Sequence, residues 1–185
     1  MIDTFLQDGE QRMGQAVDHL RHELAGIRTG YASPTLLEEL SVDYYGQSTP
    51  LKQIAGISAP EARLLVVQPW DQAALPDIEK AIITSDLGIT PSNDGRVIHL
   101  PIPPLSEDRR RDLVRIVRQR AEDGRVAVRN IRRDVHDELR ELVREKEASE
   151  DELRRSESRL QNLTDQHVQE VDLIAEQKEA EVMQV

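Results

Sequence analysis

Apolar residues recur every three or four positions in three long segments of this chain, at residues 3–29, 106–146 and from 149 onward. That spacing places them on one side of an α-helix. A single amphipathic helix cannot shield such a side from water, whereas three can do so by packing together. The sequence therefore predicts a long three-helix bundle. The apolar positions are Leu6, Met13, Val17, Leu20, Leu24 and Ile27, then Leu113, Val117, Val128, Ile131, Val135, Leu139 and Leu142, and finally Leu153, Leu160, Leu163, His167, Val171 and Ile174.

Residues that commonly begin or end helices stand at the borders of these segments. Gly30 follows the first segment, and glycine ends helices readily. Ser106 can cap the second helix, which we expect to run to about Lys146, a length of roughly 60 Å. Ser149 and Glu152 have the spacing of a capping box at the start of the third helix.

Residues 30–105 have a different character, because all nine prolines of the chain lie there. Gly46 and Asp94-Gly95 are turn signals between short runs that favour strands. One helix fits among the strands, at about Leu75 to Leu87, and ends at Gly88. This pattern predicts a small, β-rich α/β domain. The predicted strands lie at 40–45, 51–57, 63–68 and 97–102.

The predicted fold class is α+β, mainly α: a bundle made of residues 1–29 and 106–185, with an inserted domain at 30–105. The chain passes between the two parts only twice. Few contacts need to cross such a junction, so it is expected to act as a hinge. The predicted hinge residues are Thr29, Gly30, Tyr31, Pro103, Pro104 and Leu105.

Composition excludes several classes of protein. The chain has no cysteine, which rules out disulfides and thiolate metal sites and is compatible with a reducing cytoplasm. No apolar run approaches the roughly 20 residues of a membrane span, and no secretory signal is visible at the N-terminus. The net charge of −11 argues against nonspecific binding of nucleic acid. We expect a cytoplasmic monomer.

Basic residues are concentrated in the second helical segment. Residues 106–146 hold 13 of the 24 Lys and Arg residues, and 12 of these 13 are Arg. On a helical wheel they form a stripe nearly opposite the apolar side, interrupted by Glu122. One interpretation is a solvated surface of ion pairs along the helix. The other is a phosphate-binding face, because guanidinium groups suit bidentate contacts with phosphate. The stripe comprises Arg111, Arg115, Arg118, Arg125, Arg129, Arg132, Arg133, Arg140 and Arg144.

Signatures of catalysis are missing. The chain has no GxxxxGK[ST], GxGxxG or HExxH motif, and no nucleophile, base and oxyanion donor come together. His19 and His22 have a spacing that could hold a metal, but no third ligand stands near them, so no metal site is predicted. We therefore expect no catalytic residues, no metal and no cofactor.

Several motifs resemble those of the bacterial ribosome recycling factor family, and in order they cover the whole chain. They are Ile27-Arg28-Thr29-Gly30, Ala32-Ser33-Pro34, Tyr44-Tyr45-Gly46, Thr49-Pro50-Leu51, Glu79-Lys80-Ala81-Ile82, Ser85-Asp86-Leu87-Gly88, Pro103-Pro104-Leu105, Arg109-Arg110, the run from Val126 to Asp134, and Lys178-Glu179-Ala180-Glu181. One position departs from the family pattern. Tyr31 follows Thr-Gly where the family usually has Arg, so position 31 is not expected to contact phosphate.

The resemblance implies an L-shaped, non-enzymatic translation factor in which a hinged α/β domain is joined to a three-helix bundle. It implies that the bundle binds rRNA of the large ribosomal subunit. It also implies action with elongation factor G, which hydrolyses GTP, to split post-termination ribosomes. Arg129 and Arg132 match family positions that contact rRNA. The other candidate rRNA-binding residues are Arg133, Arg28 and Arg110 as neighbours, with Arg125 and Arg118 from the stripe.

Three other functions remain open on the residues alone. A coiled-coil adapter would bind protein helices and make no use of the arginines. A general RNA chaperone would bind many unstructured RNAs equally well. A small metal enzyme would use His19 and His22. Binding that is specific to the ribosome separates the recycling factor from all three.

Overall fold

The computed structural model describes residues 1–184, and their contacts divide the chain into two compact units. The first unit consists of Met1–Leu24 and Val114–Ala180. The second consists of Ala25–Leu113 together with the last residues of the chain from Glu181. Each unit has its own buried apolar core.

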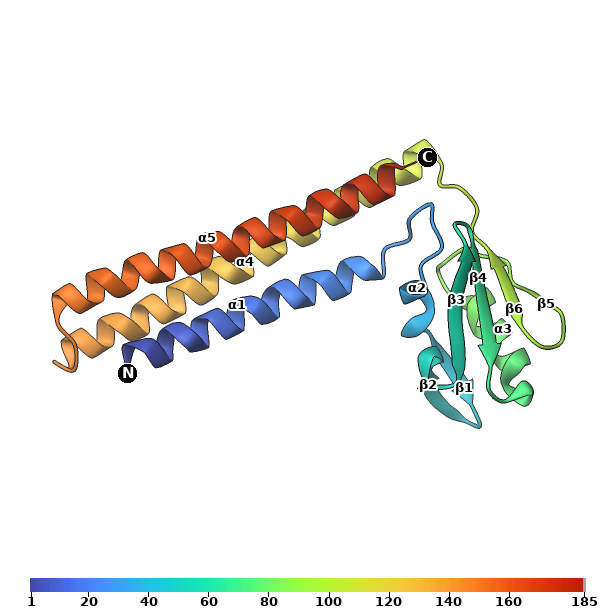
Figure 1. Ribbon diagram of the computed structural model, residues 1–185, viewed down its shortest axis with the longest axis horizontal. Helices are drawn as coiled ribbons and strands as arrows, with labels where there is room; N and C mark the ends of the chain where they lie inside the picture. Colours follow the sequence, from blue (N-terminus) through green and yellow to red (C-terminus); the bar gives the residue numbers. More distant parts are fainter. Residues whose placement is uncertain (185) are drawn as a thin grey trace. The chain divides into compact units, whose positions relative to one another are not determined.

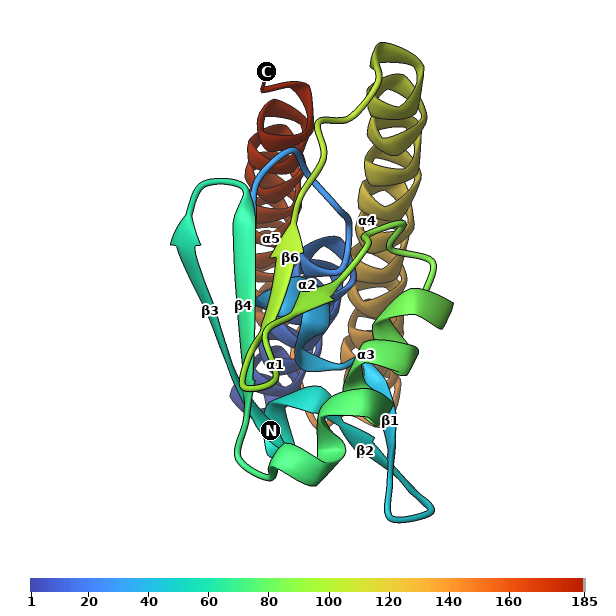
Figure 2. The same ribbon diagram turned by 90° about the vertical axis from the view of Figure 1, so that its right-hand side faces the viewer.

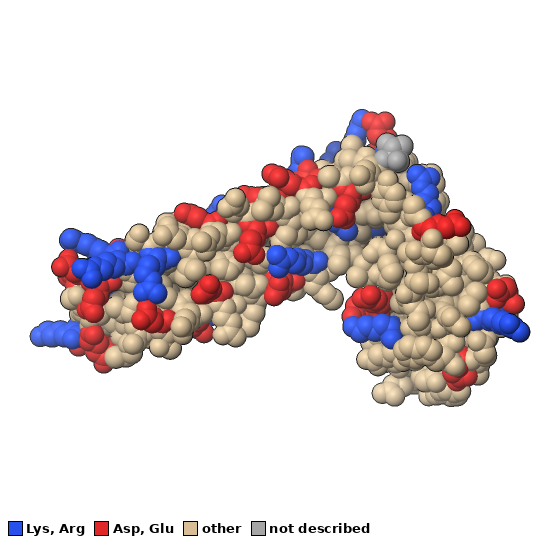
Figure 3. All heavy atoms as spheres, viewed as in Figure 1, with Lys and Arg blue, Asp and Glu red and all other residues tan. Residues whose placement is uncertain are grey.

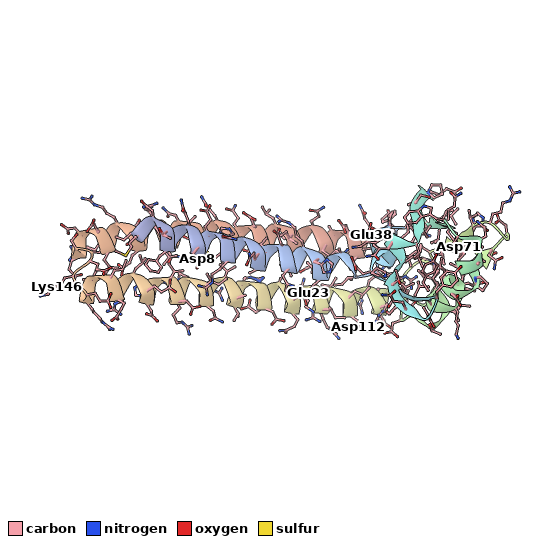
Figure 4. The ribbon with its side chains drawn as sticks, turned by 90° about the horizontal axis from the view of Figure 1, so that it is seen from below. Asp8, Glu23, Glu38, Asp71, Asp112 and Lys146 are labelled. Carbon is pink, nitrogen blue, oxygen red and sulfur yellow. The ribbon has the colours of Figure 1, made fainter. Side chains whose placement is uncertain are left out.

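The larger parts of three long helices form the first unit, as the spacing of apolar residues predicted. The helices are α1 (Ile2–Ala25), α4 (Glu107–Arg144) and α5 (Glu150–Met183), which lie side by side (Figures 1 and 4). With 38 residues, α4 is about 57 Å long. The apolar sides of α1, α4 and α5 pack against one another. The shared core includes Leu6, Met13, Val128, Val135, Leu139, Leu142, Leu153 and Leu160.

Glycines allow two close approaches between these helices. A Cβ added at Gly9 of α1 would lie 2.8 Å from Cγ2 of Val135 in α4. A Cβ added at Gly124 of α4 would lie 3.5 Å from Leu20 of α1 and 3.7 Å from Val171 of α5. At both places α4 presents its inner side to the neighbouring helix. Its outer side is thereby left to solvent.

Both predicted N-terminal caps are confirmed. The Ser106 hydroxyl accepts a hydrogen bond from the backbone N–H of Arg109 at 3.2 Å. At the start of α5, Ser149 Oγ accepts from the Glu152 N–H at 3.3 Å, while Glu152 Oε2 accepts from the Ser149 N–H at 2.8 Å. This reciprocal pair is a capping box, which satisfies two backbone donors that the helix itself leaves free.

Two helices end earlier than predicted. The first stops at Ala25 rather than near residue 29, because Gly26 has a poor helix propensity and the chain leaves the helix there. The helix at α3 (Leu75–Thr84) stops before Leu87, since Ser85 has an extended backbone. The hydroxyl of Ser85 also donates to the Ile82 carbonyl at 2.6 Å and so satisfies one of the last free acceptors of the helix.

The second unit contains six strands and two of the helices. A two-stranded sheet pairs β1 (Ser41–Tyr44) with β2 (Gln47–Pro50). A four-stranded antiparallel sheet has the order β3-β4-β6-β5. Its strands are β3 (Ala55–Glu61), β4 (Leu64–Pro69), β5 (Ser92–Asn93) and β6 (Ile98–Pro101). The helices are α2 (Thr35–Glu38) and α3, and single 3-10 turns lie at Leu51–Gln53 and Gln72–Ala74.

Most of the strand predictions are confirmed, and the exceptions have physical reasons. The predicted strand at 51–57 is divided, because its first residues form a 3-10 turn and β3 begins only at Ala55. The prediction missed β2 and β5, which are short and composed mainly of polar residues without alternation. It also missed α2, a single turn of four residues.

One face of the four-stranded sheet is covered by α3 (Figure 2). Ile78 and Ile82 of the helix and Leu65 and Leu100 of the sheet are at most 1% exposed and belong to one core. Aliphatic side chains thus stabilise this unit, as expected for a chain with only 3% aromatic residues.

Candidate nucleic-acid interface

The arginine stripe follows the outer side of α4, where the wheel placed it. Most of its side chains are exposed, and Arg125 and Arg132 are half-buried. The opposite side of the helix is packed in the core, where Val117, Val128 and Val135 are fully buried. Side chains of α4 extend outward on the side away from the other helices (Figure 4). The helix therefore combines a packing side and a solvent side along its length.

Two stripe arginines are held by carboxylates of α5. Arg118 donates from Nε to Glu179 Oε1 at 3.1 Å and from Nη2 to Oε2 at 3.0 Å, a bidentate pair. Arg125 Nε donates to Asp172 Oδ1 at 3.1 Å. The arginines are seven residues apart in α4, and the acids are seven residues apart in α5. Seven residues are two helical turns, so both pairs can form at once between the two helices.

These pairs reduce the positive charge that the first half of α4 presents to solvent. The Glu179 carboxylate raises the pKa of Arg118 by a hydrogen bond and by its charge. The Arg118 side chain is still 68% exposed, and ion pairs at such exposure contribute little to stability. Their main effects are therefore local neutralisation and a fixed lateral position for the two guanidinium groups.

Glu122 divides its carboxylate between two stripe residues of its own helix. Its Oε2 lies 3.5 Å from Arg125 Nη1, and its Oε1 lies 3.5 Å from Arg129 Nη1. Arg129 and Glu122 are both about half exposed, at 52% and 53%. Arg129 is therefore accessible to a phosphate but already has a weak anionic partner.

The second half of the stripe is different. Within residues 1–184, no hydrogen bond or ion pair involves the side chains of Arg132, Arg133 or Arg140. Arg133 and Arg140 are exposed and Arg132 is half-buried. These three guanidinium groups present unpaired donors, which is the arrangement that recognises phosphate oxygens.

Two carboxylates near this half of the stripe are paired with arginines other than Arg133 and Arg140. Asp134 Oδ2 accepts from Arg12 of α1 at 2.7 Å. Glu141 Oε2 accepts from Arg144 at 2.9 Å. The acids that follow Arg133 and Arg140 in sequence thus leave those two side chains unneutralised.

Two of the predicted RNA-binding residues, Arg28 and Arg110, lie in the second unit. Arg28 donates from Nη2 to the carbonyl of Pro103 at 2.7 Å and from Nη1 to that of Leu87 at 3.3 Å. Burial, with the nearby positive charge of Arg109, lowers the pKa of Arg28. Its contacts are those of a brace between three loops. Arg110 is half-buried, and its Nε has no partner among the described residues.

The predicted hinge residues all lie inside the second unit, whereas the division between units falls at residues 24/25 and 113/114. The residue next to each hinge segment donates a hydrogen bond to the turn between β3 and β4. The N–H of Ala32 donates to the Ala62 carbonyl at 2.7 Å, and that of Ile102 donates to the Arg63 carbonyl at 2.8 Å.

Tyr31, which departs from the family pattern, is half-buried. Its backbone N–H donates to Oγ1 of the buried Thr29 at 3.3 Å. Position 31 is therefore held through its backbone, in a contact that does not depend on which side chain stands there.

The helical unit is not basic as a whole. On the face drawn in Figure 3, basic and acidic atoms lie next to one another along the helices. His19 is exposed and lies 3.7 Å from Glu23, and residues 1–184 contain no group of three or more His, Asp or Glu that could hold a metal. No helix in that range is long and apolar enough to cross a bilayer.

The sequence prediction missed Asp172 and Glu179, which determine how much of the stripe is available. The equal spacing of these acids and of Arg118 and Arg125 was a detectable signal. It could not be used without the register between α4 and α5, because several acids of α5 have similar spacings.

Known proteins match this chain along its whole length. A family model described as ribosome recycling factor matches residues 20–183. The ribosome-recycling factor of a Geobacillus species is 54% identical over 185 residues, covering 100% of both chains. A solution structure of the ribosome recycling factor is 43% identical, with a TM-score of 0.79, and covers 100% of this chain and 98% of its own.

A second solved structure places its protein among partners. It is similar to this chain with a TM-score of 0.71 and 50% identity, and the match covers 100% of both chains. That structure comprises models for the T. thermophilus ribosome recycling factor and the E. coli elongation factor G bound to the E. coli post-termination complex.

Proposed function

The chain belongs to the ribosome recycling factor family, and we propose that Arg129 and the unpaired arginines that follow it in α4 hold it on ribosomal RNA. Its function is the recycling of ribosomes after translation has terminated. The observation that carries the proposed site is the division of the stripe. Arg118 and Arg125 have carboxylate partners in α5, whereas Arg132 and Arg133 have no partner among the described residues.

Unpaired guanidinium groups on a rigid helix suit the backbone of folded RNA. Each can donate two parallel hydrogen bonds to one phosphate. The rest of this chain is acidic and is repelled by a polyanion, since the net charge is −11. Stable binding therefore requires an RNA surface on which phosphates meet this face while the acidic faces stay clear. A large folded ribosomal RNA offers such surfaces, and an unstructured strand does not.

The partner in this function is elongation factor G, with which a related factor is placed on the post-termination complex. This chain supplies binding and no catalytic group of its own, and GTP is hydrolysed by the elongation factor. The large ribosomal subunit is the proposed binding site of the helical unit. The proposed location is the cytoplasm, because the ribosomes on which the protein acts are there.

The proposed splitting step uses movement at the two hinge segments, residues 29–31 and 103–105. Elongation factor G would push on the assembled complex, and the second unit would disturb the bridges between subunits. Support comes from the chain path, which passes between the two predicted parts only twice. A cross-link that joins the two hinge segments should abolish splitting and leave ribosome binding largely intact. Full splitting by the cross-linked protein would show that the movement is dispensable.

The test of the function is the splitting of purified post-termination ribosomes, followed by light scattering, with elongation factor G and GTP present. Wild-type protein should lower the scattering as subunits separate. The Arg132→Ala/Arg133→Ala variant should need at least tenfold more protein for the same rate, since two phosphate contacts are removed.

The matched control is Arg154→Ala/Arg155→Ala, which removes the same charge from exposed positions of α5. It should retain splitting within about twofold. Equal losses for the two variants would contradict a specific face and favour general charge attraction. No splitting by wild-type protein would contradict the proposed function itself.

A further inference from the structure

Glu122 stands at a place in the arginine stripe where its neighbours are basic. Arg118 precedes it by four residues, and Arg125 and Arg129 follow it by three and seven. All four side chains therefore project from the same side of α4. The Glu122 carboxylate lies 3.5 Å from a terminal nitrogen of both Arg125 and Arg129.

A contribution to the stability of the fold does not explain why a glutamate stands at position 122. Asp172 and Glu179 join α5 to α4 through their arginine partners, whereas the only partners of Glu122 among the described residues are arginines of its own helix. Both distances are long, and both Glu122 and Arg129 are about half exposed. Ion pairs of this kind contribute little to the free energy of unfolding. The position of Glu122 instead affects what the neighbouring arginines can bind.

We infer that Glu122 is an internal competitor for the RNA phosphate that binds Arg129, and that it limits the affinity of the factor for the ribosome. The inference rests on the proposed function. A carboxylate and a phosphate offer a guanidinium group the same kind of acceptor oxygens. A phosphate that reaches Arg129 must therefore displace the Glu122 carboxylate or tolerate its negative charge nearby.

The competition also makes the two sides of Arg129 unequal for an approaching phosphate. Arg132 and Arg133 have no anionic partner among the described residues, so a phosphate can approach Arg129 from their side without meeting Glu122. From the other side it meets a carboxylate first. Limited affinity suits a factor that has to leave the ribosome after each round, because release must follow the splitting of the subunits.

The expected size of the effect follows from Coulomb's law. A phosphate on Arg129 would be roughly 6 Å from the Glu122 carboxylate, and the site is open to solvent. At effective dielectric constants of about 40 to 80, the repulsion corresponds to about three- to tenfold in affinity. Without the carboxylate, Arg129 can neutralise its phosphate fully, which releases one more counterion from the RNA. The magnitude of the salt slope should therefore rise by up to about one.

The experiment compares Glu122→Gln with Asp123→Asn in binding to purified large ribosomal subunits across a salt series. Both variants remove one negative charge, but Asp123 is about 100° further around the helix, where its Oδ1 accepts from Gln119 at 3.0 Å. Glu122→Gln should bind three- to tenfold more tightly with a steeper salt slope. Asp123→Asn should differ from wild type by less than twofold.

A third arm tests whether the effect passes through Arg129. In an Arg129→Ala chain, Glu122→Gln should give a smaller gain than in the wild-type chain. No gain from Glu122→Gln, or an equal gain from Asp123→Asn, overturns the inference. The proposed function survives those results as long as wild-type protein binds and the Arg132→Ala/Arg133→Ala variant does not. Absence of wild-type binding overturns the proposed function first.

Discussion

Two glycines of α1 provide a matched test of how the bundle holds the outer side of α4 toward solvent. A Cβ at Gly14 would meet nothing within 4 Å, whereas a Cβ at Gly9 would lie 2.8 Å from Val135 Cγ2. Both residues lie inside the same helix, so alanine should improve the helix propensity equally at both. Only the contact with α4 distinguishes the two substitutions.

The magnitudes follow from the two contributions. Gly14→Ala should raise the free energy of unfolding by about 0.5–1 kcal/mol, because glycine costs that much inside a helix. Gly9→Ala has the same gain but adds overpacking, which typically costs about 1–3 kcal/mol. Val135 cannot turn away easily, since it is fully buried and a helical valine strongly prefers one rotamer. Gly9→Ala should therefore be about 1–3 kcal/mol less stable than Gly14→Ala.

The assay is denaturant unfolding followed by the helical circular dichroism signal. A Val135→Ala background supplies the control, because it removes the methyl group that Gly9→Ala would meet. In that background Gly9→Ala should become neutral or stabilising. If the Gly9→Ala variant is as stable as the Gly14→Ala variant, or more stable, in the otherwise wild-type chain, α1 and α4 do not approach one another closely at Gly9.

Three further predictions concern single contacts. Ser149→Ala removes the cap that accepts from Glu152, and unfolding experiments should show a loss of about 1 kcal/mol. Two backbone N–H groups, those of Val97 and Arg96, lower the pKa of Asp94 to about 2. The stability that the Asp94 carboxylate contributes is therefore complete above about pH 4 and lost as the pH falls toward 2. Asp94→Asn should remove this dependence, so that the free energy of unfolding changes less between about pH 4 and pH 2. Arg28→Ala leaves two carbonyl acceptors without their donor and should destabilise the second unit by about 1.5–3 kcal/mol, whereas an unchanged melting temperature would contradict its role as a brace.

The helical part of the fold could be predicted because its information is local. Spacing of three and four identified each long helix, and Ser106 and Ser149 marked two starts that the structure confirms within one residue. The end of the first helix was predicted too late, because Gly26 ends it before Gly30 is reached. Short polar strands such as β2 carry no alternation and gain their stability from pairing, which the sequence does not display.

The candidate site could be predicted only in outline. A wheel is enough to place arginines on one side of α4, since it depends on the geometry of one helix. Which of them are neutralised depends on the register between α4 and α5, and this is a tertiary property. Arg118 and Arg125 therefore looked equivalent to Arg132 and Arg133 until their partners were known.

The central claim is that the second half of the arginine stripe binds ribosomal RNA. Its most direct test is co-sedimentation with purified large ribosomal subunits across a salt series, comparing Arg129→Ala/Arg132→Ala with Arg118→Ala/Arg125→Ala. The first variant should lose binding and lower the magnitude of the salt slope by about one to two, with helicity unchanged: about one for Arg132 and less than one for Arg129, whose phosphate contact Glu122 weakens. The second variant removes equal charge and should bind nearly as wild type does. Saturable wild-type binding that the first variant retains in full would contradict the claim.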